Sequence, residues 1–171
     1  MTSSDARASR KPAQPPAQPR APAGPEERCA CLEARMTARA LTRMYDAALR
    51  PARLKATQYS LLAALERGAA GSISALAEAL ALERTSLTRN LRLLETAGLI
   101  APRPGGGRAV GYALTEAGRA ALAQATPLWR KAQARVLAAL GETGQAQAYA
   151  GLRALREAAR ATPGTADRGE G

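Results

Sequence analysis

The chain has 171 residues, enough for one ordinary domain with tails and a sizeable core. Hydrophobic residues make up 46% of the sequence, but aromatic residues only 3% and Phe is absent, so the core must consist mainly of Leu and Ala packed between helices. With 25 Lys and Arg against 14 Asp and Glu, the net charge is +11, which points to a polyanionic partner: nucleic acid first, an anionic membrane surface second.

The residue types that are missing narrow the chemistry further. There is no His, so the commonest general base and the commonest metal ligand are absent, and two cysteines, Cys29 and Cys31, do not make a zinc site by themselves. No apolar run approaches the roughly 20 residues that a membrane span needs, and the N-terminus lacks the apolar block of a signal peptide. We therefore predict a cytoplasmic protein with no membrane partner, no metal and no cofactor.

Two segments differ in composition from the rest of the chain. The first 28 residues, which include SRKPAQPPAQPRAPAGPEER, are rich in Pro, Ala, Gln and charge, and predict a disordered tail over 1–28. Its Arg and Lys either remain solvated or tether the protein weakly to DNA. A second tail is expected over 163–171, which leaves 29–162 as one folded domain.

Helical periodicity dominates between the tails. Apolar residues recur on one face of 31–49, which predicts one long helix that ends near Arg50 and Pro51. A second helix is predicted from 56 to 67, stopped by Gly68.

The next stretch, GSISALAEALALERTSLTRNLRLLETAGLI, contains two short helical patterns. We predict an extended segment over 72–74, a helix over 75–80, a tight turn, and a second helix that begins near Glu83. Two short helices joined by three or four residues are typical of a helix-turn-helix.

The second of these helices has two chemically different sides. Leu87, Leu91 and Leu94 fall at i, i+4 and i+7 and form the stripe that faces the core. The other side carries hydroxyls, an amide and arginines, with no carboxylate from 84 to 92, whereas a merely solvated face would mix Glu with Lys. Short hydroxyls let a helix N-terminus approach a phosphate, while Arg can pair with guanine and Asn with adenine in the major groove.

A β-hairpin is predicted after this helix. The strands are expected over 99–103 and 108–114, joined by a Gly-rich turn that matches no nucleotide-binding motif. As a wing, the hairpin would lay Arg103 and Arg108 over the DNA backbone or into a narrow minor groove. From 84 to 108 there are five arginines against one acid, so positive charge is concentrated here.

This ordered set of motifs resembles the MarR (multiple antibiotic resistance regulator) family of bacterial winged-helix transcription factors. The resemblance rests on ARALTRMYDAALRPARLKATQYSLLAAL, then SISALAEALALERTSLTRNLRLLETAGLI, then the wing and LTEAGRAAL. It implies that 75–80 supports the reading helix, that 85–95 enters the major groove, and that Arg108 is the wing-tip arginine. The family wing has Asp two residues before that arginine, whereas this chain has Gly106, so the salt bridge that orients the arginine is missing.

The candidate DNA-binding residues lie on the supporting helix, the reading helix and the wing. They are Ser74, Arg84, Thr85, Ser86, Thr88, Arg89, Asn90, Arg92, Arg103 and Arg108.

The flanking helices predict a dimer. Helices expected at 115–140 and 142–161 are longer than one winged domain requires. Their apolar side chains need a partner surface: Leu122, Leu128, Val136, Leu137, Leu140, Leu152 and Leu155. In the resembled family the first and last helices of two subunits interlace, which implies a homodimer held by 31–50 and 115–161, with the DNA reader at about 53–114. Such dimers bind near-palindromic operators on double-stranded DNA with half-sites roughly 34 Å apart.

Four residues are candidates for a regulatory switch. The resembled family includes peroxide sensors with a cysteine near the start of the first helix, so Cys29 and Cys31 are redox candidates; the alternative is that both are inert thiols. Two residues apart on a helix, they cannot easily bridge each other. Family ligands sit between the dimer helices and the winged domain, which implies Tyr45 and Tyr59 as contacts for a small aromatic acid; the alternative is plain packing. Trp129 belongs either to the dimer core or to a ligand stack.

The function predicted from these features is a sequence-specific, homodimeric DNA-binding regulator. We expect a repressor that is released by a small molecule or by oxidation. The alternative is an architectural DNA-binding protein without an effector, which would bind with little sequence preference. An enzyme is disfavoured because the sequence has no His, no paired carboxylates in one motif and no nucleophile elbow.

Overall fold

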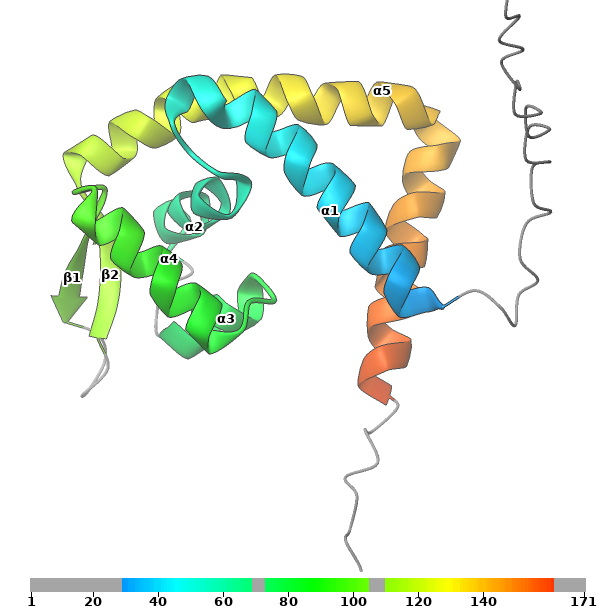
Figure 1. Cartoon of the computed structure of the whole chain (residues 1–171), viewed down its shortest axis with the longest axis horizontal. Helices are drawn as coiled ribbons and strands as arrows, with labels where there is room; N and C mark the ends of the chain where they lie inside the picture. The colour runs from blue at the N-terminus through cyan, green and yellow to red at the C-terminus, as the bar shows by residue number, and fades with distance from the viewer. Residues whose placement is uncertain (1–28, 69–72, 105–109, 162–171) are drawn as a thin grey trace, which may run out of the picture.

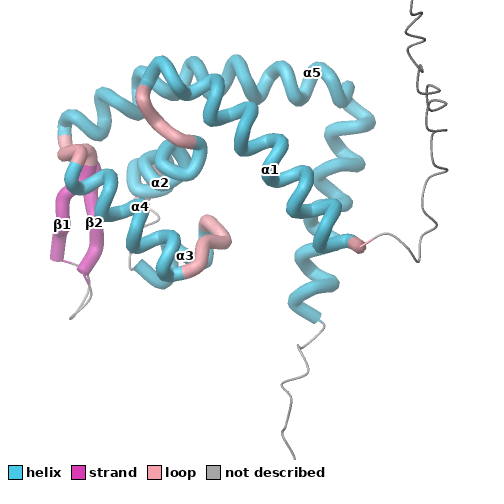
Figure 2. Tube along the Cα trace, viewed as in Figure 1, coloured by secondary structure: helices cyan, strands magenta, loops and turns pink. Residues whose placement is uncertain are grey.

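The computed structural model describes residues 29–68, 73–104 and 110–161 (Figure 1). The elements in chain order are α1 (Ala30–Leu49), the short 3-10 helix η2 (Arg50–Ala52), α2 (Ala56–Glu66), α3 (Ile73–Ala79), α4 (Arg84–Thr96), β1 (Ile100–Pro104), β2 (Val110–Leu114) and α5 (Glu116–Ala161). This mostly helical fold with one hairpin confirms the predicted fold class, and Figure 2 shows how little of the described chain is loop. The predicted tails lie outside the described residues.

Leucines form the core of the reader between α2, α3, α4 and the hairpin. Leu87, Leu91 and Leu94 of α4 are almost completely buried, which confirms the predicted stripe. The largest fully buried side chains are Leu49, Leu61, Leu62, Leu76, Leu87, Leu91, Leu94 and Ile100. Because α4 contributes leucines to this centre, which is mostly aliphatic apart from Tyr59, burial of apolar surface holds α4 against α2 and leaves its polar side outward.

The hairpin is a two-stranded antiparallel sheet anchored at its base. Its register pairs Ile100 with Leu114 at the base and Arg103 with Gly111 further out. Ile100 and Leu114 are buried, and Tyr112, two residues before Leu114 on the same face of β2, packs partly buried against the core. The base is therefore fixed to the core, while the turn over 105–109 lies outside the described residues.

One predicted element is wrong. The extended segment expected over 72–74 does not form at Ile73 and Ser74, because α3 already begins at Ile73. Ile73, Leu76 and Ala77 share the i, i+3, i+4 spacing of one helical face, and all three contact the core. A three-residue strand without a pairing strand offers no comparable burial, so the helical spacing prevails.

Helix α5 consists of two arms, which correspond to the helices predicted over 115–140 and 142–161. The backbone leaves the helical region at Gly141, with φ 64° and ψ 173°, between the arms 116–140 and 142–161. Such a φ suits glycine, which has no Cβ to clash. Figure 1 shows the consequence: the first arm runs along α1 and α2, and the second arm turns back toward the start of α1.

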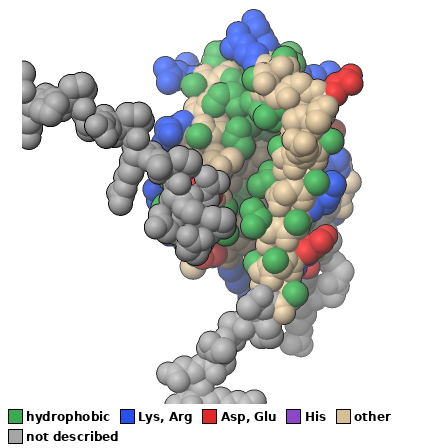
Figure 3. Space-filling view, turned by 90° about the vertical axis from the view of Figure 1, so that its right-hand side faces the viewer, with side chains coloured by type: hydrophobic (Ala, Val, Ile, Leu, Met, Phe, Trp, Pro, Cys, Tyr) green, Lys and Arg blue, Asp and Glu red, His purple; other side chains and the backbone are tan. Residues whose placement is uncertain are grey.

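An apolar face remains uncovered on α1, the end of the first arm of α5 and its second arm. The exposed large side chains there are Leu32, Met36, Leu140, Tyr149, Leu152 and Leu155. Figure 3, which shows the molecule from the right-hand side of Figure 1, displays hydrophobic side chains gathered on this face. Leu122 and Leu128 correct the prediction, because they pack against the core of their own chain and need no partner.

No helix among the described residues is long and apolar enough to cross a membrane.

Candidate DNA-binding interface

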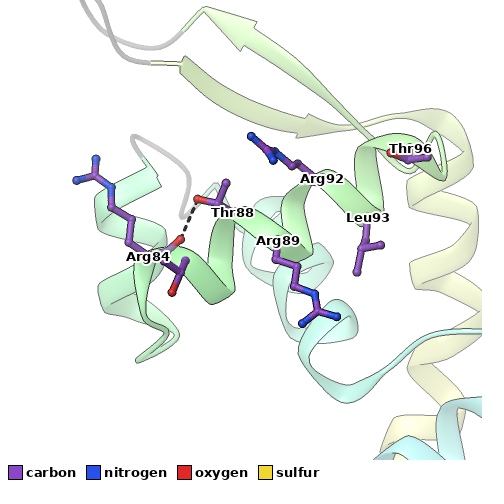
Figure 4. A pocket seen from close by; sticks show the side chains of 7 residues that line it. Arg84, Thr88, Arg89, Arg92, Leu93 and Thr96 are labelled. Atoms are coloured by element: carbon purple, nitrogen blue, oxygen red, sulfur yellow. Dashed lines mark hydrogen bonds between the residues drawn. The ribbon is translucent and has the colours of Figure 1, made fainter.

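The outer side of α4 forms a shallow, open hollow of about 570 Å³ (Figure 4). Its lining residues are Arg84, Thr85, Thr88, Arg89, Arg92, Leu93 and Thr96, all of them exposed. Three of these side chains are cationic and none is a carboxylate. The structure thus brings together five of the predicted DNA-binding residues on one face.

The arginines of this hollow form no ion pair with another residue that the structure describes. The ion pairs within 29–68, 73–104 and 110–161 join Lys55 to Asp46 and Arg119 to Glu116, and neither involves an arginine of α4. Three positive charges therefore stand about one helical turn apart with no acid among them to neutralise them, which favours an anionic partner.

Two of the short polar side chains of α4 are hydrogen-bonded to their own helix. The Thr88 hydroxyl donates to the carbonyl oxygen of Arg84 at 2.8 Å, and the Asn90 amide donates to the carbonyl oxygen of Ser86 at the same distance. Asn90 is half-buried beside the leucine stripe and does not line the hollow. This bond engages one of the two N–H groups of the Asn90 amide, so the predicted adenine contact would use the other N–H and Oδ1.

The turn between α3 and α4 sets the direction of the reading helix. Helix α3 ends in a Schellman arrangement, in which the N–H groups of Ala81 and Leu82 donate to the carbonyls of Glu78 and Ala77 at 3.1 and 2.9 Å. Ala81 adopts φ 49°, the left-handed conformation that this closure requires. Ser74 lies exposed near the opposite end of α3, so α3 also presents a hydroxyl to the surface.

Of the two predicted wing arginines, the structure describes one. Arg103 lies exposed on β1, and Arg108, like Gly106, lies outside the described residues.

The start of α5 fastens the wing and the end of α4 to the long helix. The Thr115 hydroxyl donates to the carbonyl oxygen of Gly98 at 2.6 Å and accepts a hydrogen bond from the N–H of Gly118 at 3.0 Å. It therefore caps the start of α5 and also links it to the residue that follows α4. A Cβ at Gly118 would collide with the carbonyl oxygen of Leu99 and lie 2.9 Å from its carbonyl carbon. The sequence LTEAG is thus required for the close approach of two backbones.

Tyr45 and Tyr59 both stack on Trp129. The ring centroids are 6.5 Å apart for Tyr45 and 5.5 Å for Tyr59, with interplanar angles of 19° and 21°. Trp129 therefore packs within its own chain, between α1 and α2. Tyr59 is buried in the core, whereas Tyr45 is half-buried.

A series of hydrogen bonds that the sequence did not predict crosses the bend of α5. The Tyr45 hydroxyl donates to Oε1 of Gln133 on the first arm, and Nε2 of Gln133 donates to the Tyr149 hydroxyl on the second arm at 3.1 Å. Burial, and then the nearby Tyr149, raise the pKa of Tyr45. The partners lie 88 and 16 residues apart, and no local pattern signals such contacts.

The cysteines occupy the start of α1. Cys29 is the residue before the helix and Cys31 lies in its first turn, and both are exposed free thiols. Only Cys31 lines the groove of about 870 Å³ between the start of α1 and the second arm of α5.

Comparisons with known proteins agree with this geometry. The MarR family model matches residues 54–109, from α2 through the wing. The M. tuberculosis transcriptional regulator MosR is 40% identical, with 80% of this chain and 98% of MosR covered and a TM-score of 0.71. A MosR structure in complex with DNA is 41% identical over 78% of this chain and 99% of that one, with a TM-score of 0.67.

A more distant structure shares the fold. A mutant of E. coli MarR complexed with operator DNA is 22% identical over 73% of this chain and 91% of that one, with a TM-score of 0.66. No curated protein sequence matches the chain. The alignment with MosR extends over almost the whole of that protein. The segment that the family model matches, 54–109, is the part of this chain that carries the basic hollow. The chain therefore belongs to the MarR family of DNA-binding transcriptional regulators, which are not enzymes.

Proposed function

We propose that this protein is a homodimeric repressor that reads a near-palindromic operator with the outer side of α4. The observation that carries the proposal is the hollow on α4, where three unpaired arginines and short hydroxyls surround an opening without any carboxylate. In the major groove, Arg89 and Arg92 would pair with base edges, while Arg84 and the hydroxyls of Thr85 and Thr88 would hold phosphates. Ser74, Ser86, Asn90, Arg103 and Arg108 complete the proposed contact surface.

The uncovered apolar face supports the dimer. Leu152, Leu155 and Tyr149 of the second α5 arm line the groove that also reaches Cys31 at the start of α1. Exposed aliphatic side chains over two adjacent helices are unfavourable in water, and a second copy would cover them with the same surface around a two-fold axis. The two α4 helices of the dimer would then enter successive major grooves on the same side of the DNA, roughly 34 Å apart.

For release, we propose a signal received where α1 meets the reader. Tyr45 presents a half-buried ring there, and a hollow of about 590 Å³ at the end of α1 offers cations to a carboxylate. That hollow is lined by Arg43, Asp46, Ala47, Arg50, Arg53, Leu54 and Lys55. The carboxylate of a small aromatic acid would find positive charge in this hollow, while the Tyr45 ring, which does not line it, stacks on Trp129. The exposed thiols of Cys29 and Cys31 provide the oxidative alternative.

Selection from a random duplex pool tests the proposed DNA reading. The full chain should enrich a sequence with two related half-sites, and its affinity at physiological salt should exceed that for random duplex by at least about 10³-fold. Binding that is equal for all sequences would instead support the architectural alternative.

The release signal is tested with the enriched duplex. The double variant Cys29→Ser, Cys31→Ser and the native chain are titrated with peroxide and with salicylate-like acids while DNA binding is measured. Peroxide release that survives the double replacement rules out the thiols. DNA binding that no acid alters rules out a pocket for this class of ligand.

A further inference from the structure

Leu93 is an exposed aliphatic side chain that lines the basic hollow. It is 51% exposed, although Leu87, Leu91 and Leu94 of the same helix are buried. The other exposed large hydrophobic side chains of the described residues all lie on α1 and α5, on the face that we assign to the dimer: Leu32, Met36, Leu140, Tyr149, Leu152 and Leu155. Leu93 lies on α4 instead, so the dimer does not account for it.

The position of Leu93 continues the row of Arg89. Thr85, Arg89 and Leu93 fall at i, i+4 and i+8, and all three line the hollow. In Figure 4 the side chains of Arg89 and Leu93 point to the same side of α4, whereas Arg92 points toward the hairpin. Leu93 lies roughly 6 Å further along the helix axis than Arg89, a length close to two base-pair steps.

An apolar side chain on a groove-reading surface has one matching group on DNA. The major-groove edges of the bases carry hydrogen-bond donors and acceptors, except for the C5-methyl group of thymine. We propose that Leu93 reads a thymine methyl group in the operator, within about two base pairs of the one that Arg89 contacts. This inference rests on the proposed function, because it requires that α4 lie in the major groove.

Deoxyuridine provides the test, because it pairs as thymidine does but lacks the methyl group. In the operator enriched by the full chain, each thymidine is replaced in turn by deoxyuridine, symmetrically in both half-sites, and the Kd of the native dimer is measured. At one position per half-site the replacement should weaken binding about fourfold per half-site, the effect of one lost methyl contact. For Leu93→Ala the same replacement should change nothing.

Two further variants keep the result interpretable. Leu93→Met retains an apolar side chain and should keep part of the thymidine preference, whereas Leu140→Ala truncates an exposed leucine outside α4 and should keep all of it.

The proposal is overturned if Leu93→Ala retains every deoxyuridine effect, if the native dimer shows none, or if the operator has no thymine near the Arg89 contact. Arg89→Ala, measured in parallel, separates the two levels: if it loses specificity while Leu93→Ala does not, the reading function stands and the role of Leu93 fails. If neither variant loses specificity, the proposed reading by α4 fails as well.

Discussion

Arg89 stands in the row that continues to Leu93, and its charge is not neutralised by any acid that lines the hollow. An unpaired guanidinium on a helix surface is well solvated and adds little to folding, so its presence there is better explained by what the helix binds. Its neighbour Asn90 differs, since its amide is already bound to the helix backbone. At the scale of single residues, the reading surface therefore contains side chains that are wholly available to DNA and others, such as Asn90, that are partly engaged with their own helix.

Arg89→Ala should reduce binding to the enriched operator about 10- to 100-fold more than binding to random duplex, because a base-edge pair contributes about 1–3 kcal/mol of discrimination. Fluorescence anisotropy with both duplexes at one salt concentration measures the difference. Arg130→Ala, which removes an exposed arginine of α5, should lower both affinities together or leave them unchanged. Equal losses on both duplexes for Arg89→Ala would make this residue a phosphate contact only.

Tyr45 predicts a pH dependence of stability. Its pKa is raised in the native state, first by burial and then by Tyr149, so the native protein keeps this proton when the unfolded chain has already lost it. The stabilisation from Tyr45 is therefore complete below the ordinary tyrosine pKa of about 10 and is lost as the pH rises through the native value. Tyr45→Phe should lose stability less steeply than the native chain above pH 10, and the two should run parallel between pH 7 and 9. Urea unfolding midpoints of both proteins, measured from pH 7 to above pH 10, test this expectation. Parallel curves above pH 10 would contradict a raised pKa of Tyr45.

At the scale of elements, the ends of α3 and α4 close in the same way with different residues. After α4, Gly98 adopts φ 69°, and the N–H groups of Gly98 and Leu99 donate to the carbonyls of Glu95 and Leu94 at 2.8 and 2.9 Å. After α3, Ala81 occupies the equivalent left-handed position. An L-residue with a Cβ is strained there by roughly 1–2 kcal/mol, and glycine is not. The turn that orients the reading helix is therefore less stable with Ala81 than it would be with glycine at that position.

Ala81→Gly should stabilise the protein by about 0.5–1 kcal/mol, the relief of left-handed strain less the larger entropy of glycine in the unfolded chain. Gly98→Ala provides the matched reverse change and should destabilise by a similar or larger amount. Urea unfolding of both variants measures the two effects. Destabilisation by Ala81→Gly would show that the α3–α4 turn adopts another conformation.

At the scale of the whole molecule, the bend of α5 decides which surfaces are available to a partner. Because Gly141 directs the second arm back toward α1, apolar side chains of two segments distant in sequence form one continuous groove. The hydrogen bonds from Tyr45 through Gln133 to Tyr149 join both arms to α1. The groove and the reader are thus connected through α1 and the first arm of α5.

Leu152→Asp should prevent dimer formation, because it places a charge in a groove that the second copy would cover, where burial of an unpaired carboxylate is strongly unfavourable. Sedimentation should show a monomer, and affinity for the enriched operator should fall to that of a single half-site. Leu152→Met keeps the apolar surface and should remain dimeric. A dimer that survives Leu152→Asp with unchanged stability would place the interface elsewhere.

The sequence by itself determined the helical class, the element boundaries to within two residues, and the composition of the reading face. It could do so because these properties depend on local spacing: leucines at i, i+4 and i+7 define the buried side of α4, and the residues between them must face outward. Residues 72–74 are the exception, because three residues carry too little periodicity to distinguish a strand from the start of a helix.

Only the tertiary structure decided which side chains meet across long separations. That Leu122 and Leu128 pack against the core of their own chain, that Trp129 stacks with both Tyr45 and Tyr59, and that Leu93 is exposed in the basic hollow depends on how the helices pack. The position of Gly118 against the carbonyl of Leu99 is of the same kind. Periodicity assigns a residue to a face of its helix, but what lies opposite that face is set by the bend at Gly141 and by the packing of the core.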